Sequence, residues 1–189
     1  MQTATADTVE RGLAPEFRIG ALRGAKTAEV QKLLADFAGR RAQEGLRVAG
    51  VIEEPTPEEL CGICGSLVLR DMAGGSLIPI TQNLGSGSTA CSLDSAGLAA
   101  ACQAVLAAID QGADLVVLSK FGKIESEGGG LIDAFRAAAE AGIPCVTGVA
   151  PSFAGPFLDY AGGFSQWIEA SGAALERWWN GYADRPGVL

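Results

Sequence analysis

The chain has 189 residues, which is long enough for one well-buried core and short for two. Its net charge of −8 argues against a nucleic-acid-binding surface, and the absence of histidine excludes an imidazole base and any His-ligated metal site. Because the sequence shows no secretory signal and no apolar run that could cross a bilayer, we expect a cytoplasmic protein without membrane contact. Residues 1–14 are expected to form a flexible tail and residues 15–189 a single domain.

Strand and helix patterns alternate along the first half of the chain. A short apolar strand at 17–21 leads into a glycine-containing turn, and apolar residues at helical spacing predict a helix at 27–44. A second strand follows at 46–52. Strands at 67–70 and 77–81 are separated by Ala-Gly-Gly, which predicts a β-hairpin.

The second half continues the alternation. Asp94 is the predicted N-cap of a helix, and the apolar run at 114–119 is typical of a strand buried on both faces of a parallel sheet. A further helix, a strand at 145–149 and a last helix near 166–179 complete the pattern. Strands separated by helices predict a doubly wound α/β fold whose mostly parallel sheet carries an inserted β-hairpin.

The segment after the first strand carries a phosphate-loop motif with one departure. It reads Gly20-Ala-Leu-Arg-Gly24-Ala25-Lys26-Thr27, which matches G-x-x-x-x-G-K-[ST] except at Ala25. In such a loop, backbone N–H groups and the helix dipole bind phosphate, the lysine reaches the β and γ phosphates, and the hydroxyl binds Mg²⁺. We therefore predict that Gly20, Gly24, Lys26 and Thr27 bind ATP or GTP with Mg²⁺. The alternative is an ordinary strand-to-helix turn.

The strand that should bind Mg²⁺ has no acid at its end. In hydrolytic P-loop enzymes an apolar strand ends in a carboxylate that holds the metal. Here the strand ends in Ser119 and Lys120. Glu125 and Glu127 follow in the next loop and could approach the site; the alternative is that they belong to a solvated polar loop without a ligand. Lys26 and Glu125 are the candidate catalytic residues, and we expect weak nucleoside-triphosphatase activity at most.

Three cysteines form a candidate metal site. Cys61 and Cys64 have the C-x-x-C spacing that suits Zn²⁺ or another soft metal, and Cys91 is the best third ligand. A redox switch is one alternative, and cysteines without any ligand are another. Cys102 and Cys145 fall in an apolar helix stripe and a strand, so we expect both in the core.

Cationic residues are expected near the end of the sheet where α/β folds usually bind ligands. Arg70 and Lys120 are candidates for binding an anion, and Lys123 is a candidate for binding nucleotide. Three tryptophans near the C-terminus are expected to pack on their own domain, with a partner surface as the alternative.

The order of these segments resembles two related families. The phosphate-loop segment, then ADLVVLSKFGKIE and then GIPCVTGV are similar to the archaeal and bacterial nucleoside-triphosphatases and to the molybdopterin-guanine-dinucleotide biosynthesis adaptors, which bind GTP. Gly122, Lys123 and Glu125 match their motif Asp-Glu-Ile-Gly-Lys-Met-Glu. Ser119 and Lys120 replace its two acids.

A closer resemblance is to a bacterial family of unknown function, regarded as a diverged branch of that group. Its pattern is a close cysteine pair, then LRD, then Cys-x-Leu-Asp, then [RK]-F-G-K-x-E. This sequence supplies the pattern in order, as Cys61 and Cys64, Leu69 to Asp71, Cys91 to Asp94, and Lys120 to Glu125. The resemblance covers about residues 16–165. It implies a three-layer, P-loop-NTPase-like fold and a link to molybdenum, since members often sit beside molybdenum-uptake genes.

Three functions stay open. The first is a diverged P-loop-like protein that binds nucleotide and is at most a weak NTPase. The second is a non-enzymatic protein that binds a metal or an oxyanion such as molybdate, with Cys61, Cys64 and Cys91 holding a thiolate-bound metal or molybdenum species. The third is a ligand-free scaffold or regulatory domain. A homo-oligomer is compatible with each of them.

Overall fold

The computed structural model of the protein describes residues 18–54, 67–82 and 92–183. Its centre is a seven-stranded sheet made of β1 (Ile19–Arg23), β2 (Val48–Glu54), β3 (Val68–Asp71), β4 (Leu77–Pro79), β7 (Leu115–Phe121), β8 (Cys145–Val149) and β9 (Ser165–Glu169). The strand order is β4-β3-β2-β7-β8-β1-β9. Neighbours from β2 to β9 are parallel, whereas β3 and β4 are antiparallel to their neighbours.

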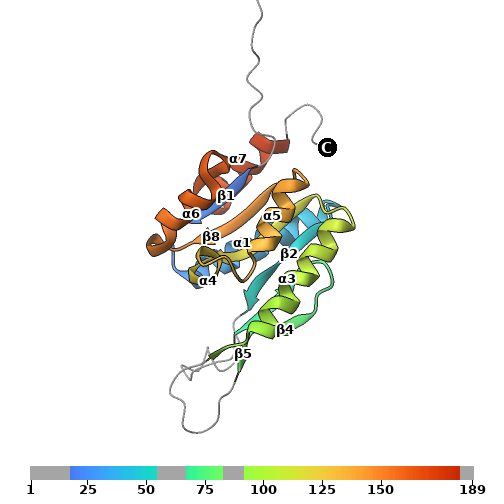
Figure 1. Ribbon diagram of the computed structural model, residues 1–189. Coiled ribbons are helices and arrows are strands. Elements are labelled where there is room, and N and C mark those ends of the chain that lie inside the picture. Colours follow the sequence, from blue (N-terminus) through green and yellow to red (C-terminus); the bar gives the residue numbers. More distant parts are fainter. Residues whose placement is uncertain (1–17, 55–66, 83–91, 184–189) are drawn as a thin grey trace, which may run out of the picture.

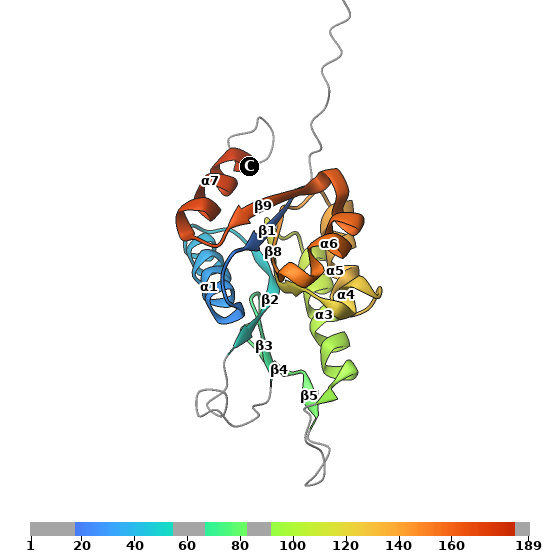
Figure 2. The same ribbon diagram turned by 90° about the vertical axis from the view of Figure 1, so that its left-hand side faces the viewer.

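Helices cover both faces of this sheet (Figure 1). Figure 2 shows α1 (Thr27–Gln43) and α7 (Gly172–Ala183) on one face. The opposite face carries α3 (Ser95–Asp110), α4 (Lys123–Ser126), α5 (Ile132–Glu140) and α6 (Ala154–Ala161). Two short helices, η1 (Pro151–Phe153) and η2 (Gly162–Phe164), flank α6, and β5 (Thr81–Gln82) pairs with β6 (Ser92–Leu93) in a separate ladder. The predicted three-layer α/β fold is confirmed, and it is consistent with a P-loop-NTPase-like architecture.

Each face of the sheet has its own hydrophobic core. Leu34 and Phe37 of α1 are fully buried against the sheet on the α1 and α7 face. Phe121 and Phe135 are buried on the other face, with ring centroids 5.9 Å apart. Strand β7 supplies both cores because its side chains alternate between the faces, which explains its continuous apolar sequence.

The predicted hairpin is confirmed, and it extends the main sheet. Strand β3 pairs with β2, and β4 pairs with β3 at the end of the sheet. The turn between them is stabilised by Asp71, whose carboxylate accepts hydrogen bonds from Ala73 N at 3.1 Å and Gly74 N at 2.9 Å. Asp71, the last residue of the Leu-Arg-Asp motif, therefore has a structural role in this turn.

The predicted helix near 166–179 is wrong in its first part. Residues Ser165–Glu169 form β9, which pairs with β1 along all five residues, and α7 begins only at Gly172. Pairing with β1 outweighs the local pattern, because it satisfies the backbone groups on that side of β1. Trp178 and Trp179 are buried in the core under α7, so their predicted packing on their own domain is confirmed.

The predicted tail, residues 1–14, lies outside the described residues, and the assignment of 15–189 to a single domain stays a prediction. Of the helices in the part of the chain that the structure describes, none has the length and apolar character needed to span a membrane.

Gly20 lies inside β1, where α7 packs closely against the strand. A Cβ atom at this position would be 2.7 Å from Ile168 Cδ1 and 2.9 Å from Trp178 Cε2. We expect Gly20→Ala to lower the free energy of unfolding by about 1–3 kcal/mol, because the added methyl group overpacks this contact. Urea denaturation measures the change.

Gly39→Ala is the matched control for this substitution. Gly39 lies within α1, and a Cβ there would meet nothing within 4 Å. We expect it to be neutral or to stabilise by up to about 1 kcal/mol, because alanine is the better helix former. Equal stability of the two variants would contradict the close contact at Gly20.

Candidate functional site

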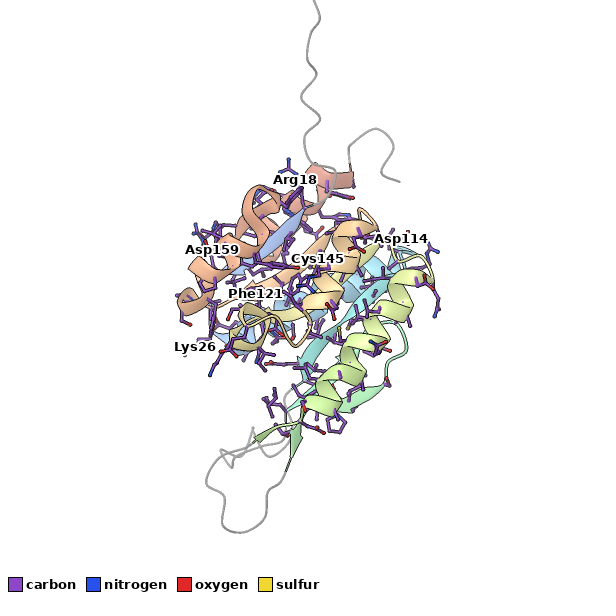
Figure 3. All side chains as sticks on the ribbon, viewed as in Figure 1. Arg18, Lys26, Asp114, Phe121, Cys145 and Asp159 are labelled. Carbon is purple, nitrogen blue, oxygen red and sulfur yellow. The ribbon has the colours of Figure 1, made fainter. Side chains whose placement is uncertain are left out.

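The candidate site lies where the parallel strands end. The carboxyl ends of β1, β2, β7, β8 and β9 meet at one edge of the sheet, which we call the carboxyl edge. Open α/β sheets usually bind ligands at this edge. Lys26 follows β1, and Phe121 is the last residue of β7. Figure 3 shows both on the side of the molecule away from Asp114, which precedes β7.

The connection from β1 to α1 is shorter than the motif predicts. Arg23 is still part of β1, pairs in register with Glu169, and accepts a hydrogen bond from Ala170 N at 2.9 Å. The expectation that the loop begins at Gly20 is therefore wrong, because β9 prolongs the pairing of β1. Only residues 24–26 connect the strand to the helix. Gly24 has φ of +90°, which favours glycine.

The short loop presents the start of α1 to solvent. Ala25 packs against the core under α1, so the methyl group that departs from the motif lies against protein. The first hydrogen bond of α1 runs from Val30 N to Lys26 O at 3.0 Å. The N–H groups of Thr27 and the next two residues precede it, and such groups bind anions at helix N-termini. Lys26 and Thr27 are both exposed.

A pocket of about 900 Å³ opens beside this helix start. It lies between α1, the end of β2 and strand β3. Its lining consists of Thr27, Ala28, Gln31, Lys32, Ala35, Ile52, Glu53, Glu54, Leu67, Arg70 and Met72. The volume and the mixture of apolar walls with a few polar groups are typical of small-molecule sites. The pocket reaches the start of α1, because Thr27, the first residue of the helix, is part of its lining.

Gln31 connects the pocket to the sheet. Its side chain is buried, donates a hydrogen bond to Ser119 O at 2.7 Å and accepts one from Glu53 N at 3.0 Å. It thus links α1 to β2 and β7 where the two strands end. Gln31 could not be recognised from the sequence, because it lies among helix-spaced apolar residues and belongs to no motif.

The two cations predicted to bind an anion are both paired with carboxylates of β2. Arg70 Nη2 donates to Glu54 Oε2 at 2.8 Å, and Lys120 forms an ion pair with Glu53. Glu53 and Glu54 were not among the predicted site residues, although adjacent glutamates at the end of a buried strand are a recognisable signal. Lys123 lies apart from them on α4, exposed to solvent.

The carboxylate of Glu125 accepts hydrogen bonds from the backbone. The residue is buried, its Oε2 accepts from Gly122 N at 3.0 Å, and its Oε1 accepts from Leu131 N at 3.1 Å. Glu125 therefore stabilises the turn after β7, which gives the Phe-Gly-Lys-x-Glu motif a structural role. Among the described residues, β7 itself ends without a carboxylate, since Ser119, Lys120 and Phe121 are its last three.

The predicted cysteine cluster cannot be placed. Cys61, Cys64 and Cys91 all lie outside the described residues, so their metal site stays a prediction. Within residues 18–54, 67–82 and 92–183, no three His, Cys, Asp or Glu side chains are grouped so that they could hold a metal ion. Cys102 and Cys145 are buried free thiols in the core, as expected, and burial raises the pKa of both.

The role of Glu125 can be tested by a conservative substitution. Glu125→Gln would place an amide N–H₂ against one of the two backbone N–H groups, which leaves a buried donor without an acceptor. We expect a loss of about 1–3 kcal/mol in the free energy of unfolding. Chemical denaturation measures it. Glu127→Gln, at an exposed residue two positions further, should change stability by less than about 0.5 kcal/mol.

Comparison with known proteins adds two findings. Residues 19–178 match the family described as Protein of unknown function (DUF2478). A relative in Bradyrhizobium diazoefficiens, the Molybdenum import ATP-binding protein ModC 2, is 35% identical over 168 residues. The match covers 89% of this chain but 19% of the relative. The chain therefore spans about a fifth of that protein's length.

Proposed function

The chain belongs to the family of proteins of unknown function DUF2478, and we propose that it binds a nucleotide at the carboxyl edge without hydrolysing it. The observation that carries the proposal is the pocket of about 900 Å³ that opens directly beside the exposed start of α1. An anion site and a largely apolar cavity are thereby adjacent. A nucleotide combines the same two parts, a phosphate group and a flat base.

The phosphate would lie at the loop. Gly24 allows the tight turn, the first N–H groups of α1 have no partner within the helix and could bind an anion, and Lys26 supplies a positive charge. Thr27 would offer its hydroxyl to the same group. Gly20, in contrast, supports this arrangement through its contact with α7 and not from the loop.

The base would lie in the pocket. Ala28, Ala35 and Ile52 provide apolar walls, while Gln31 and Glu54 provide polar atoms at defined positions. Such a combination gives both burial and hydrogen-bond selection of a ring system.

Hydrolysis is disfavoured by the groups around the loop. A P-loop enzyme needs a carboxylate that holds Mg²⁺ and a group that orients water. In the described part of the chain, Glu125 accepts two backbone hydrogen bonds and Glu53 is paired with Lys120, so neither carboxylate is free to take these roles.

The similarity to the molybdenum import protein supports the proposal in outline. That relative is named an ATP-binding protein, which agrees with a nucleotide site, and its import role suggests that this chain acts in molybdenum metabolism. Because the match covers 19% of the relative, the proposal rests mainly on the geometry of the carboxyl edge and only secondarily on the relative's name.

Isothermal titration calorimetry of the full chain tests the proposal. We expect adenine or guanine nucleotides to bind and Lys26→Ala to weaken that binding about tenfold or more, since a charge-assisted hydrogen bond to phosphate is lost. Arg177→Ala is the matched control, because it removes an exposed cation on α7 and should leave the affinity unchanged. Absence of binding by every nucleotide, or equal affinity of both variants, would contradict the proposal.

Phosphate release provides the second measurement. With Mg²⁺ and ATP or GTP we expect no release above that of a protein-free control, because, in the described part of the chain, β7 ends without a carboxylate and both Glu53 and Glu125 are already engaged. Sustained release that disappears in Lys26→Ala would show that the protein is an NTPase after all.

A further inference from the structure

The cations of the carboxyl edge are almost all neutralised within the protein. Five of them form ion pairs, namely Arg23 with Glu169, Lys32 with Asp36, Arg70 with Glu54, Lys120 with Glu53, and Lys123 with Glu127. Among the described residues, no carboxylate forms an ion pair with Lys26. In the part of the chain that the structure describes, this edge therefore offers a ligand one unpaired cationic side chain, Lys26.

The start of α1 already carries a negative charge. Glu29 lies in the first turn, and its Oε2 accepts a hydrogen bond from Lys26 N at 3.2 Å. Glu169 lies on the other side of the loop, since a Cβ on Gly24 would be 3.1 Å from Glu169 Oε2. Two carboxylates thus flank the place where a phosphate would bind. Glu29 also offsets part of the positive charge that the helix dipole places at the start of α1.

Breaking the ion pairs would not change this balance. Exposed pairs such as Arg23 with Glu169 open at little cost. Each cation released in this way leaves its carboxylate beside the ligand, however, so the net charge of the edge stays the same. Additional phosphate groups would therefore gain little attraction and would meet additional repulsion.

From this balance we infer that the ligand of the carboxyl edge is a nucleoside monophosphate, bound through one phosphate at Lys26 and Thr27. The inference rests on the proposed function, because it concerns the same site, and it specifies the ligand class. The single phosphate matches the single unpaired cation, and the nucleoside occupies the pocket beside Thr27. Mg²⁺ has no part in this binding.

Calorimetry with matched ligands tests the inference. AMP, GMP, ATP and GTP are titrated into the full chain, each with and without Mg²⁺. We expect the monophosphate to bind at least as tightly as the triphosphate of the same base, with a ratio that Mg²⁺ changes by less than about twofold. A triphosphate that binds about tenfold more tightly than its monophosphate would overturn the inference and leave the proposed function intact. Failure of all four ligands to bind would overturn both.

A charge variant gives an independent measurement. Glu169→Gln removes one flanking carboxylate and frees Arg23, so it should strengthen triphosphate binding by about threefold or more beyond any gain for the monophosphate. Glu140→Gln, an exposed position on α5, removes a carboxylate elsewhere and should change neither affinity. Equal effects of Glu169→Gln on both ligands would overturn the inference.

Discussion

The buried amide of Gln31 holds together the parts on which the carboxyl edge depends. Ladder pairing of β2 with β7 runs as far as Val51 and Leu118. Beyond that point Glu53 N and Ser119 O would be left without partners in the interior, which is costly for backbone groups. Gln31 satisfies both, and it comes from α1. The position of α1 is thereby fixed relative to the two strands, and so is the pocket that lies between them.

A second constraint brings α1 close to the neighbouring strand. Gly148 of β8 lies under the helix, and a Cβ there would be 2.7 Å from Val30 Cγ1. A close helix places the loop at the level of the strand ends, where N–H groups of the first turn face outward. The exposed start of α1 and the cavity beside it are therefore products of helix packing as much as of Gly24 in the loop.

Much of the fold could be predicted from the sequence because its signals are local. Asp94 is an N-cap, and its carboxylate accepts a hydrogen bond from Ala96 N at 3.0 Å as expected. Strand β9 was missed because its pairing partner, β1, is about 145 residues away in the chain. The length of the loop was wrong for the same reason, since β9 prolongs β1.

The site itself was less predictable than the fold. Glu125 follows a strand as a metal ligand would, yet it is directed at backbone N–H groups of a turn that closes six residues later. The charges of Arg70 and Lys120 are visible in the sequence, whereas their neutralisation by Glu54 and Glu53 depends on strand pairing and on the packing of the edge. A sequence motif gives residue types, and only tertiary structure shows which of them remain available to a ligand.

The burial of two cysteines has a practical consequence for chemical labelling. Thiolates react with alkylating reagents, and burial of Cys102 and Cys145 keeps both protonated and covered in the folded protein. Any fast-reacting thiol of the native chain must therefore be Cys61, Cys64 or Cys91. If a bound metal protects those three thiols, the slower alkylation could be measured without a background from the two core cysteines.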